Sequence, residues 1–184
     1  METMSCSTKM GREKIMMPST RRRRGVITAA VVVVGAILWY LFRPELLFVD
    51  KSVNEAFPTA SASSAGNHSF GKALTQGMFH SAAHETRGTA AVYELAGGKR
   101  VLRLTGFETS NGPDVHVFLG KAADASDNDT VKDAGYVDLG SLKGNIGDQN
   151  YDIPADVNPS EYKSVTIWCN RFNVNFGTAP LKTN

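Results

Sequence analysis

The chain has 184 residues and a formal net charge of +2, and this charge is unevenly distributed. Residues 1–43 contain eight Lys or Arg and two Asp or Glu, whereas residues 44–184 contain twelve and sixteen, so the two parts carry net charges of +6 and −4. The longer, acidic part has no basic stripe interleaved with aromatic residues, which argues against nucleic-acid binding.

An uncharged apolar segment from Gly25 to Phe42 follows the basic N-terminus. Its 18 residues would form a helix about 27 Å long, close to the thickness of a bilayer's hydrocarbon core. Seven Lys or Arg precede this segment and few follow it closely. This bias predicts a signal anchor in the cell membrane, with a cytoplasmic tail over residues 1–24, a transmembrane helix over 25–42 and an extracytoplasmic C-terminal part.

A cleaved signal peptide is the alternative interpretation of the apolar segment. Such a peptide has an apolar core of about 7 to 15 residues that ends close to a small-residue cleavage site. Here the apolar run is longer, and the nearest such pattern, Ala60 to Ala62, lies far beyond its end. The four arginines before Gly25 also resemble a twin-arginine export signal, although the hydrophobic positions that should follow the pair are replaced.

Two further regions follow the apolar segment. Residues 43–66 end in the small-residue and proline stretch "PTASASSAG", which predicts a flexible stalk. Residues 67–184 comprise 118 positions, enough for one hydrophobic core of ordinary size. We therefore expect a single domain after the stalk.

Short blocks of this domain alternate apolar and polar residues with a period of two, which is typical of strands. Turn signals separate the blocks at the spacing of an all-β protein. The sequence thus predicts an antiparallel β-sandwich or barrel. Gly97 and Gly98 should join two of the blocks in a tight hairpin, because glycine readily adopts positive φ at both central positions. The blocks are "TAAVYEL", "RVLRL", "DVHVFL", "SVTIWC" and "FNVNF".

The block "SVTIWC" contains Cys169, which shares one strand face with Val165 and Ile167. After Cys169 the apolar positions change phase, so we expect either a bulge at Asn170 and Arg171 or a long strand buried on opposite faces in its two halves. Either arrangement would disturb the sheet beside Cys169. Arg171 could then lower the pKa of the thiol and favour the reactive thiolate.

Cys169 is the one cysteine of the predicted extracytoplasmic part, because the other cysteine, Cys6, precedes the apolar segment. It would therefore have no disulfide partner within the chain. Four explanations stay open for such a thiol: burial as a small hydrophobe, chemical reactivity, a bond to another chain, or ligation of a metal or heme.

The order of several motifs resembles the DM13 domain. They are "GMFHSAAHETRGTAAVY", "RVLRLTGFETSNGPDVHVFL", "LGSLKGNIGDQNYDIP" and "SVTIWCNRFNVNFGTAPL", and together they cover about Gly77 to Leu181. The resemblance implies electron transfer or oxidative modification at a cell surface. It also implies that one cysteine, which corresponds to Cys169, acts as a bare thiol or as a ligand to a group such as heme. The DOMON and cytochrome b561 domains that accompany DM13 in some animal proteins are absent from this sequence.

Three histidines are candidate ligands. His80 and His84 have the i, i+4 spacing of a helical metal pair, but they stand between strands and lack the glutamate of a zincin. The resemblance includes a histidine that corresponds to His84, for which a hydrogen-bonding role in a loop is the alternative. His116 alternates with Val115 and Val117 and lies on the opposite strand face, where it is either a partly buried residue with satisfied hydrogen bonds or a heme ligand, the first being favoured.

The sequence does not indicate a phosphate-binding loop or a hydrolase active site. The polar, glycine-rich segment from Gly144 to Tyr151 could bind a ligand or close a turn, of which the turn is favoured, and it lacks the lysine and serine of a phosphate-binding loop. No Ser, His and Asp arrangement typical of a hydrolase is readable. The expected function is a membrane-anchored redox module that acts through Cys169 with an unidentified protein partner. The alternatives are a non-catalytic module for cell-surface binding or adhesion, and a structural ectodomain without chemistry.

Overall fold

The computed structural model describes residues 20–42, 49–58 and 71–183, and it comprises two compact units that divide after Phe42. Each unit is described by itself below. Cys6, the segment from Ala60 to Ala62 and most of the expected stalk lie outside the described residues.

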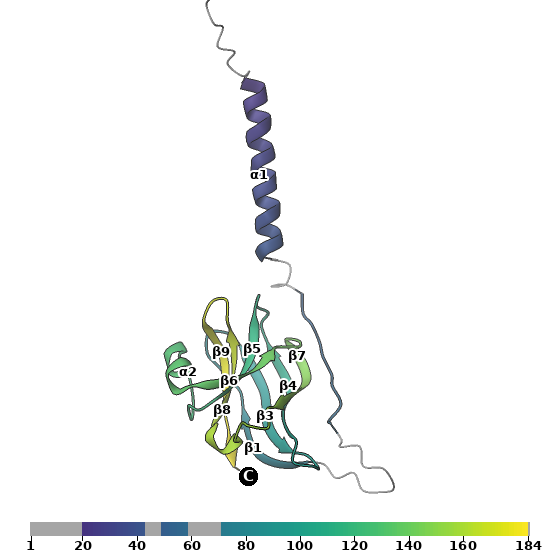
Figure 1. Ribbon diagram of the computed structural model, residues 1–184, viewed down its shortest axis with the longest axis vertical. Helices are drawn as coiled ribbons and strands as arrows, with labels where there is room; N and C mark the ends of the chain where they lie inside the picture. The colour runs from purple at the N-terminus through teal and green to yellow at the C-terminus, as the bar shows by residue number, and fades with distance from the viewer. Residues whose placement is uncertain (1–19, 43–48, 59–70, 184) are drawn as a thin grey trace, which may run out of the picture. The chain divides into compact units, whose positions relative to one another are not determined.

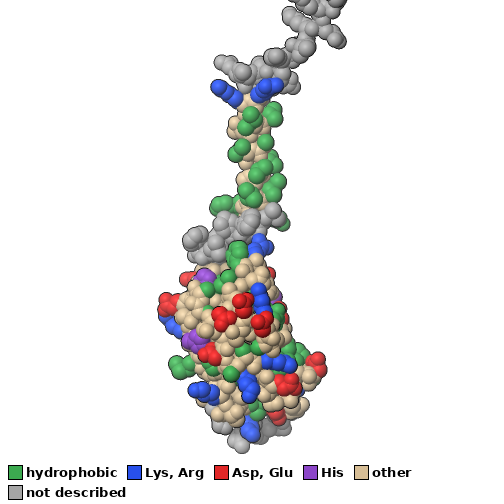
Figure 2. Space-filling model, turned by 90° about the vertical axis from the view of Figure 1, so that its left-hand side faces the viewer, with side chains coloured by type: hydrophobic (Ala, Val, Ile, Leu, Met, Phe, Trp, Pro, Cys, Tyr) green, Lys and Arg blue, Asp and Glu red, His purple; other side chains and the backbone are tan. Residues whose placement is uncertain are grey.

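The first unit contains one helix, α1 (Thr20–Phe42), whose 23 residues span about 35 Å. Its stretch Arg23–Tyr40 has a mean hydropathy of 1.5, and none of the side chains in this stretch is buried. Figure 2 shows hydrophobic side chains along the helix and basic ones at its N-terminal end. Helix α1 is therefore long and apolar enough to cross a membrane. The helix begins five residues before the predicted segment, because Thr20 and the four arginines extend it at its N-terminal end.

The second unit is a sandwich of two antiparallel five-stranded sheets, which confirms the predicted fold class (Figure 1). The first sheet has the strand order β10-β1-β3-β4-β7. Its strands are β1 (Lys72–Met78), β3 (Thr86–Glu94), β4 (Arg100–Thr109), β7 (Ile146–Ile153) and β10 (Lys182–Thr183).

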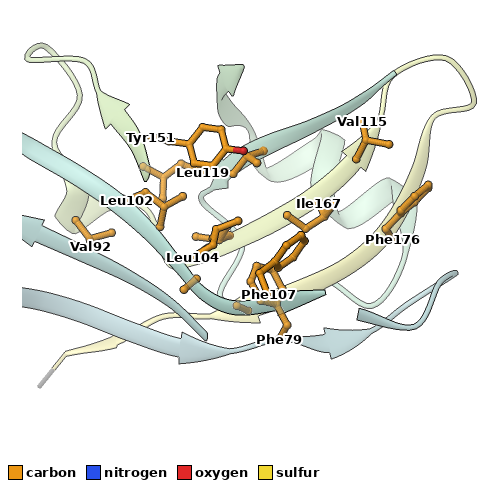
Figure 3. Close-up of a cluster of buried hydrophobic side chains, with 14 of the residues drawn as sticks. Phe79, Val92, Leu102, Leu104, Phe107, Val115, Leu119, Tyr151, Ile167 and Phe176 are labelled. Atoms are coloured by element: carbon orange, nitrogen blue, oxygen red, sulfur yellow. The ribbon is translucent and has the colours of Figure 1, made fainter. Parts of the chain in front are cut away.

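The second sheet has the strand order β2-β9-β8-β5-β6, so that β8 and β5 lie at its centre. Residues from both sheets fill the space between them, as Figure 3 shows for Val92, Leu104 and Ile167. The strands of this sheet are β2 (His80–Ser81), β5 (Val115–Gly120), β6 (Tyr136–Ser141), β8 (Ser164–Cys169) and β9 (Val174–Pro180). A short 3-10 helix, η2 (Pro159–Glu161), precedes β8.

Strand β8 is buried at all six of its positions, which the period-two pattern alone does not predict. Its inward residues, Cys169 included, join the core between the sheets. Its outward residue Trp168 packs with Phe118 and with Val131 of a short helix, α2 (Asn128–Ala134). Asp127 caps this helix by accepting a hydrogen bond from the backbone N–H of Thr130 at 2.8 Å. Helix α2 thus covers the outer face of the second sheet.

The expected hairpin between β3 and β4 is confirmed. Glu94 and Arg100 pair in register, and Gly97 and Gly98 between them have φ values of +86° and +78°. The backbone N–H of Leu95 donates to the carbonyl of Lys99 at 2.8 Å and closes the turn. Both glycines lie in the left-handed region that only glycine enters at low cost.

Residues 49–58, hereafter the strap, belong to the segment expected as a stalk and run beside the exposed edge of β7 (Figure 1). Ser52 forms a parallel bridge with Ile146, and the N–H groups of Val53 and Glu55 donate to the carbonyls of Ile146 and Asp148, both at 2.9 Å. The strap therefore extends the first sheet at its β7 edge.

Candidate functional site

Cys169 is the last residue of β8 and its side chain is fully buried, with 0% of its surface exposed. It pairs with Val115 of β5 on one side and with Val174 of β9 on the other. Its side chain belongs to the core cluster with Val165 and Ile167, as the alternation of the sequence predicted. The thiol is therefore shielded from solvent at the end of a central strand.

The chain after Cys169 differs from both expected arrangements. Strands β8 and β9 are separate and form a hairpin through residues 170–173, in which Asn173 has φ of +53°. The register shift of this pair lies further along β9, where Ile167 pairs with Gly177 and Trp168 with Asn175. The sheet is therefore irregular beside Cys169, but the irregularity is on the neighbouring strand.

Arg171 and Phe172 lie at the tip of this hairpin and are exposed, Phe172 by 59%. The backbone N–H of Asn170 donates to the carbonyl of Asp114 at 2.9 Å and ties the hairpin to the "NGPD" loop. Arg171 is thus two residues from Cys169 in sequence but on the surface, while the thiol is inside. Its effect on the thiol remains a prediction.

A surface hollow of about 270 Å³ lies at this end of the sandwich. The "NGPD" loop and the loop around Asn145 form most of its wall, and the strap contributes Val49 and Lys51. Val115 lines the hollow and also pairs with Cys169. Side chains of directly paired residues on one face lie about 5 Å apart, so Val115 places the thiol close to the wall of the hollow.

The segment 144–151, interpreted from the sequence as a turn, is mostly strand, because β7 begins at Ile146. A buried glutamine of β7 holds the short loop before this strand. The side-chain carbonyl of Gln149 accepts hydrogen bonds from the backbone N–H groups of Lys143 and Gly144 and from the hydroxyl of Tyr151. Its amide group donates to the carbonyl of Gly144 at 2.7 Å. Burial raises the pKa of Tyr151 to about 12, so the phenol stays protonated as a donor.

His116 is held between two carboxylates on the outer face of the second sheet. Its Nδ1 lies 2.8 Å from Asp138 and its Nε2 lies 3.2 Å from Asp114. The ring is on the opposite face of the sheet from the side chain of Cys169, because His116 pairs with Trp168. The two side chains therefore point away from each other and cannot ligate the same heme.

His80 and His84 have different partners. Nε2 of His80 lies 2.7 Å from Asp124, and this hydrogen bond raises the pKa of the imidazole against the opposing effect of burial. The ring of His84 forms a hydrogen bond with Ser110 at 2.8 Å and packs on Phe176 at a tilt, with ring centroids 3.9 Å apart, and burial lowers the pKa of His84. In the part of the chain that the structure describes, no three His, Cys, Asp or Glu side chains form a metal-binding group.

The packing around Cys169 also tests whether a heme fits there. The side chain is enclosed by close-packed core residues of both sheets, and Cys169 does not line the hollow nearby. A macrocycle would need a cavity at the sulfur, which this arrangement does not provide. The described residues therefore do not fit a heme bound through Cys169.

An aromatic stack on the outer side of β8 was not predicted from the sequence. The ring of Phe118 stacks on Tyr136 with centroids 4.1 Å apart and on Trp168 with centroids 5.9 Å apart. The ammonium group of Lys132, on α2, lies 5.6 Å from the centre of the Trp168 ring. The alternation of β8 placed Trp168 on this face, but only the position of α2 shows that the ring is covered.

Comparison with known proteins decides the family. A family model described as Electron transfer DM13 matches residues 78–181, more than half of the chain. The chain belongs to the DM13 family. No curated protein and no solved structure matches it. The DM13 match includes Cys169 and the "NGPD" loop, whereas α1 and the strap lie before it.

Proposed function

We propose that this DM13 protein is a membrane-anchored electron-transfer module whose domain lies outside the cytoplasm and whose redox group is the thiol of Cys169. The observation that carries the proposal is the DM13 match, which spans Cys169 and is described by electron transfer. Cys169 is also the free cysteine of the described residues. The basic residues before the apolar segment support a cytoplasmic N-terminus.

The reaction proposed for Cys169 is oxidation of the thiol by hydrogen peroxide. The sulfur attacks one peroxide oxygen, the O–O bond breaks, a sulfenic acid forms and water leaves with the thiol proton. Because the sulfur is fully buried, this step needs access through the end of the sandwich, where Val115 lines the hollow and pairs with Cys169. Arg171, at the hairpin tip, would favour the thiolate when this end opens.

The test is a thiol titration of the purified full chain, followed by treatment with hydrogen peroxide. We expect native Cys169 to react slowly but measurably, and a sulfenic-acid reagent to label it only after peroxide. Arg171→Ala should slow the labelling, whereas Lys163→Ala, an exposed substitution just before β8, should not. A thiol that reacts only in denaturant would refute the redox role.

The complete burial of Cys169 favours a second candidate function, a non-catalytic module for cell-surface binding. In this alternative the cysteine is a small apolar core residue. Cys169→Ala would then destabilise the domain by about 1–2 kcal/mol through lost contacts, and every cell-surface phenotype of the protein would persist. A loss of phenotype at wild-type abundance would support the redox role instead.

The orientation has its own test. Protease added to intact cells should digest the domain, and an antibody to the C-terminus should bind without permeabilisation. Protection of the C-terminus from both reagents would contradict the proposed topology.

A further inference from the structure

The strap occupies the β7 edge as a strand with alternating burial. Val53, Glu55 and Phe57 are half-buried, whereas Ser52, Asn54 and Ala56 between them are exposed. Three backbone hydrogen bonds join it to β7: from the N–H groups of Val53 and Glu55, and from the N–H of Ile146 to the carbonyl of Lys51 at 3.4 Å. This is the arrangement by which an extended peptide adds to a sheet edge.

Glu55 anchors the strap by charge. Its two carboxylate oxygens lie 2.8 and 3.0 Å from Nζ of Lys143, and one also accepts a hydrogen bond from the backbone N–H of Asn150 at 2.7 Å. Nη1 of Arg103 donates to the backbone carbonyl of Glu55 at 3.1 Å. Lys143 therefore pairs with the carboxylate of Glu55, and Arg103 holds the backbone at the same position.

Phe57 anchors the strap by packing. Its ring meets Tyr93 edge-on with centroids 4.8 Å apart, and the guanidinium of Arg103 lies 5.7 Å from the ring centre.

Two glycines of the domain allow the backbone of the strap to approach closely at the residues that precede Phe57. A Cβ at Gly144 would lie 2.3 Å from the carbonyl oxygen of Lys51, and one at Gly147 would lie 2.1 Å from that of Val53. The β7 edge is thus shaped for this peptide.

The segment between the strap and β1 is long enough for the strap to reach a second copy of the domain. Phe57 packs against Tyr93, and Ala73 of β1 pairs with the same Tyr93, so both ends of this segment lie close to one residue. Twelve residues, 59–70, stand between the described ends. An extended chain of that length spans up to about 40 Å, which is enough for the strap to reach the β7 edge of an adjacent copy.

We infer that the strap exchanges between two copies of this chain, each copy placing residues 49–58 on the β7 edge of the other. All hydrogen bonds, the ion pair to Glu55 and the Phe57 packing are the same in the exchanged and unexchanged forms. Exchange of an identical element is a low-cost route to a two-fold symmetric dimer. Anchoring in one membrane would raise the effective concentration of the second copy. The inference does not depend on the chemistry of Cys169.

The experiment uses two differently tagged full-length chains, co-expressed in membranes on a Cys6→Ser background. One carries Ser52→Cys and the other Ile146→Cys, at the two positions that form the parallel bridge. A short thiol crosslinker should join the two tags. A third chain that carries both substitutions measures the unexchanged form as an intrachain product.

Two controls separate exchange from random collision. Pairing Ser52→Cys with Asp156→Cys, an exposed position after the other end of β7, should give little product. Adding Glu55→Ala and Phe57→Ala to the Ser52→Cys chain should reduce the intertag product at least fivefold, whereas Ala56→Ser, at an exposed strap position, should preserve it. An intrachain product without an intertag product would overturn the exchange, and the absence of both would overturn the strap pairing on which it rests.

Discussion

Val115 and Cys169 lie opposite each other in the β5–β8 pairing, and Val115 also lines the hollow at the end of the sandwich. Val115 is therefore in reach of both the hollow and the neighbourhood of the buried thiol. Val117, two residues further along β5, also points into the core, pairs with Ile167 and does not line the hollow. The two valines form a matched pair for testing how reagents reach Cys169.

Val115→Ala should accelerate alkylation of native Cys169 well beyond the acceleration caused by Val117→Ala. Both substitutions remove buried methyl groups and should lower the free energy of unfolding by about 2 kcal/mol, so global opening affects both to a similar degree. Only Val115→Ala also widens the hollow beside Cys169. The measurement is the rate of iodoacetamide labelling, with stability determined by urea denaturation. Equal rates in the two variants would show that the thiol is reached only by general unfolding.

Gly147→Ala should destabilise the domain more than Gly140→Ala. Both glycines have positive φ, +103° and +108°, so each substitution incurs a backbone cost of about 1–3 kcal/mol. A Cβ at Gly147 would also collide with the carbonyl oxygen of Val53 in the strap, whereas a Cβ at Gly140 has open space. Thermal unfolding of the two variants measures the difference. The same loss in both would mean that the strap is not held against Gly147 in solution.

The anchor of the strap should weaken in acid. Burial alone would raise the pKa of Glu55, but hydrogen bonds from Lys143 and Asn150 outweigh burial and hold the pKa below the ordinary value of 4.5. The stabilisation is therefore complete above about pH 4.5 and is lost as the pH falls through the lower, folded-state pKa. Hydrogen exchange at Val53 and Glu55 should show this loss of protection. Glu55→Gln should remove the pH dependence, and an unchanged profile in that variant would contradict the assignment.

Tyr151 should make the domain sensitive to alkaline pH. Its pKa is raised by burial from 10.0 to about 12, so folding favours the protonated phenol. The resulting stabilisation is complete below pH 10 and is lost as the pH rises from 10 through about 12. Stability measured across this range should fall more steeply in the wild type than in Tyr151→Phe. The substitution also removes the hydrogen bond to Gln149, so Tyr151→Phe should be less stable at neutral pH, by about 1 kcal/mol.

Much of the sandwich could be predicted because its strands follow a simple physical rule. Alternation in "SVTIWC" assigned Cys169 to the core face and Trp168 to the other, and the pair Gly97 and Gly98 fixed the β3–β4 hairpin. The hairpin after Cys169 was missed because residues 170–173 contain neither glycine nor proline. Its positive φ falls on Asn173, since asparagine tolerates the left-handed conformation better than most residues.

Two elements that surround the candidate site were missed for different reasons. Helix α2 has seven residues, too few to show a helical period, although Asp127 three positions before Thr130 is a capping pattern. The strap does alternate at Val53, Glu55 and Phe57. The small residues that follow the strap dominate the composition of residues 43–66, and this composition led to the prediction of a stalk. In addition, no local pattern shows which sheet edge a single short strand will join.

The position of Trp168 gives the domain a built-in optical reporter. The sequence has two tryptophans, and the other, Trp39, belongs to helix α1, so the intrinsic tryptophan fluorescence of residues 43–184 comes from Trp168 alone. This indole is 2% exposed and directly precedes Cys169 in β8. Its emission should be that of an indole shielded from water. The emission should move to longer wavelength when α2 detaches or when β8 becomes exposed to solvent. Changes next to the candidate thiol can therefore be followed in real time without an attached label.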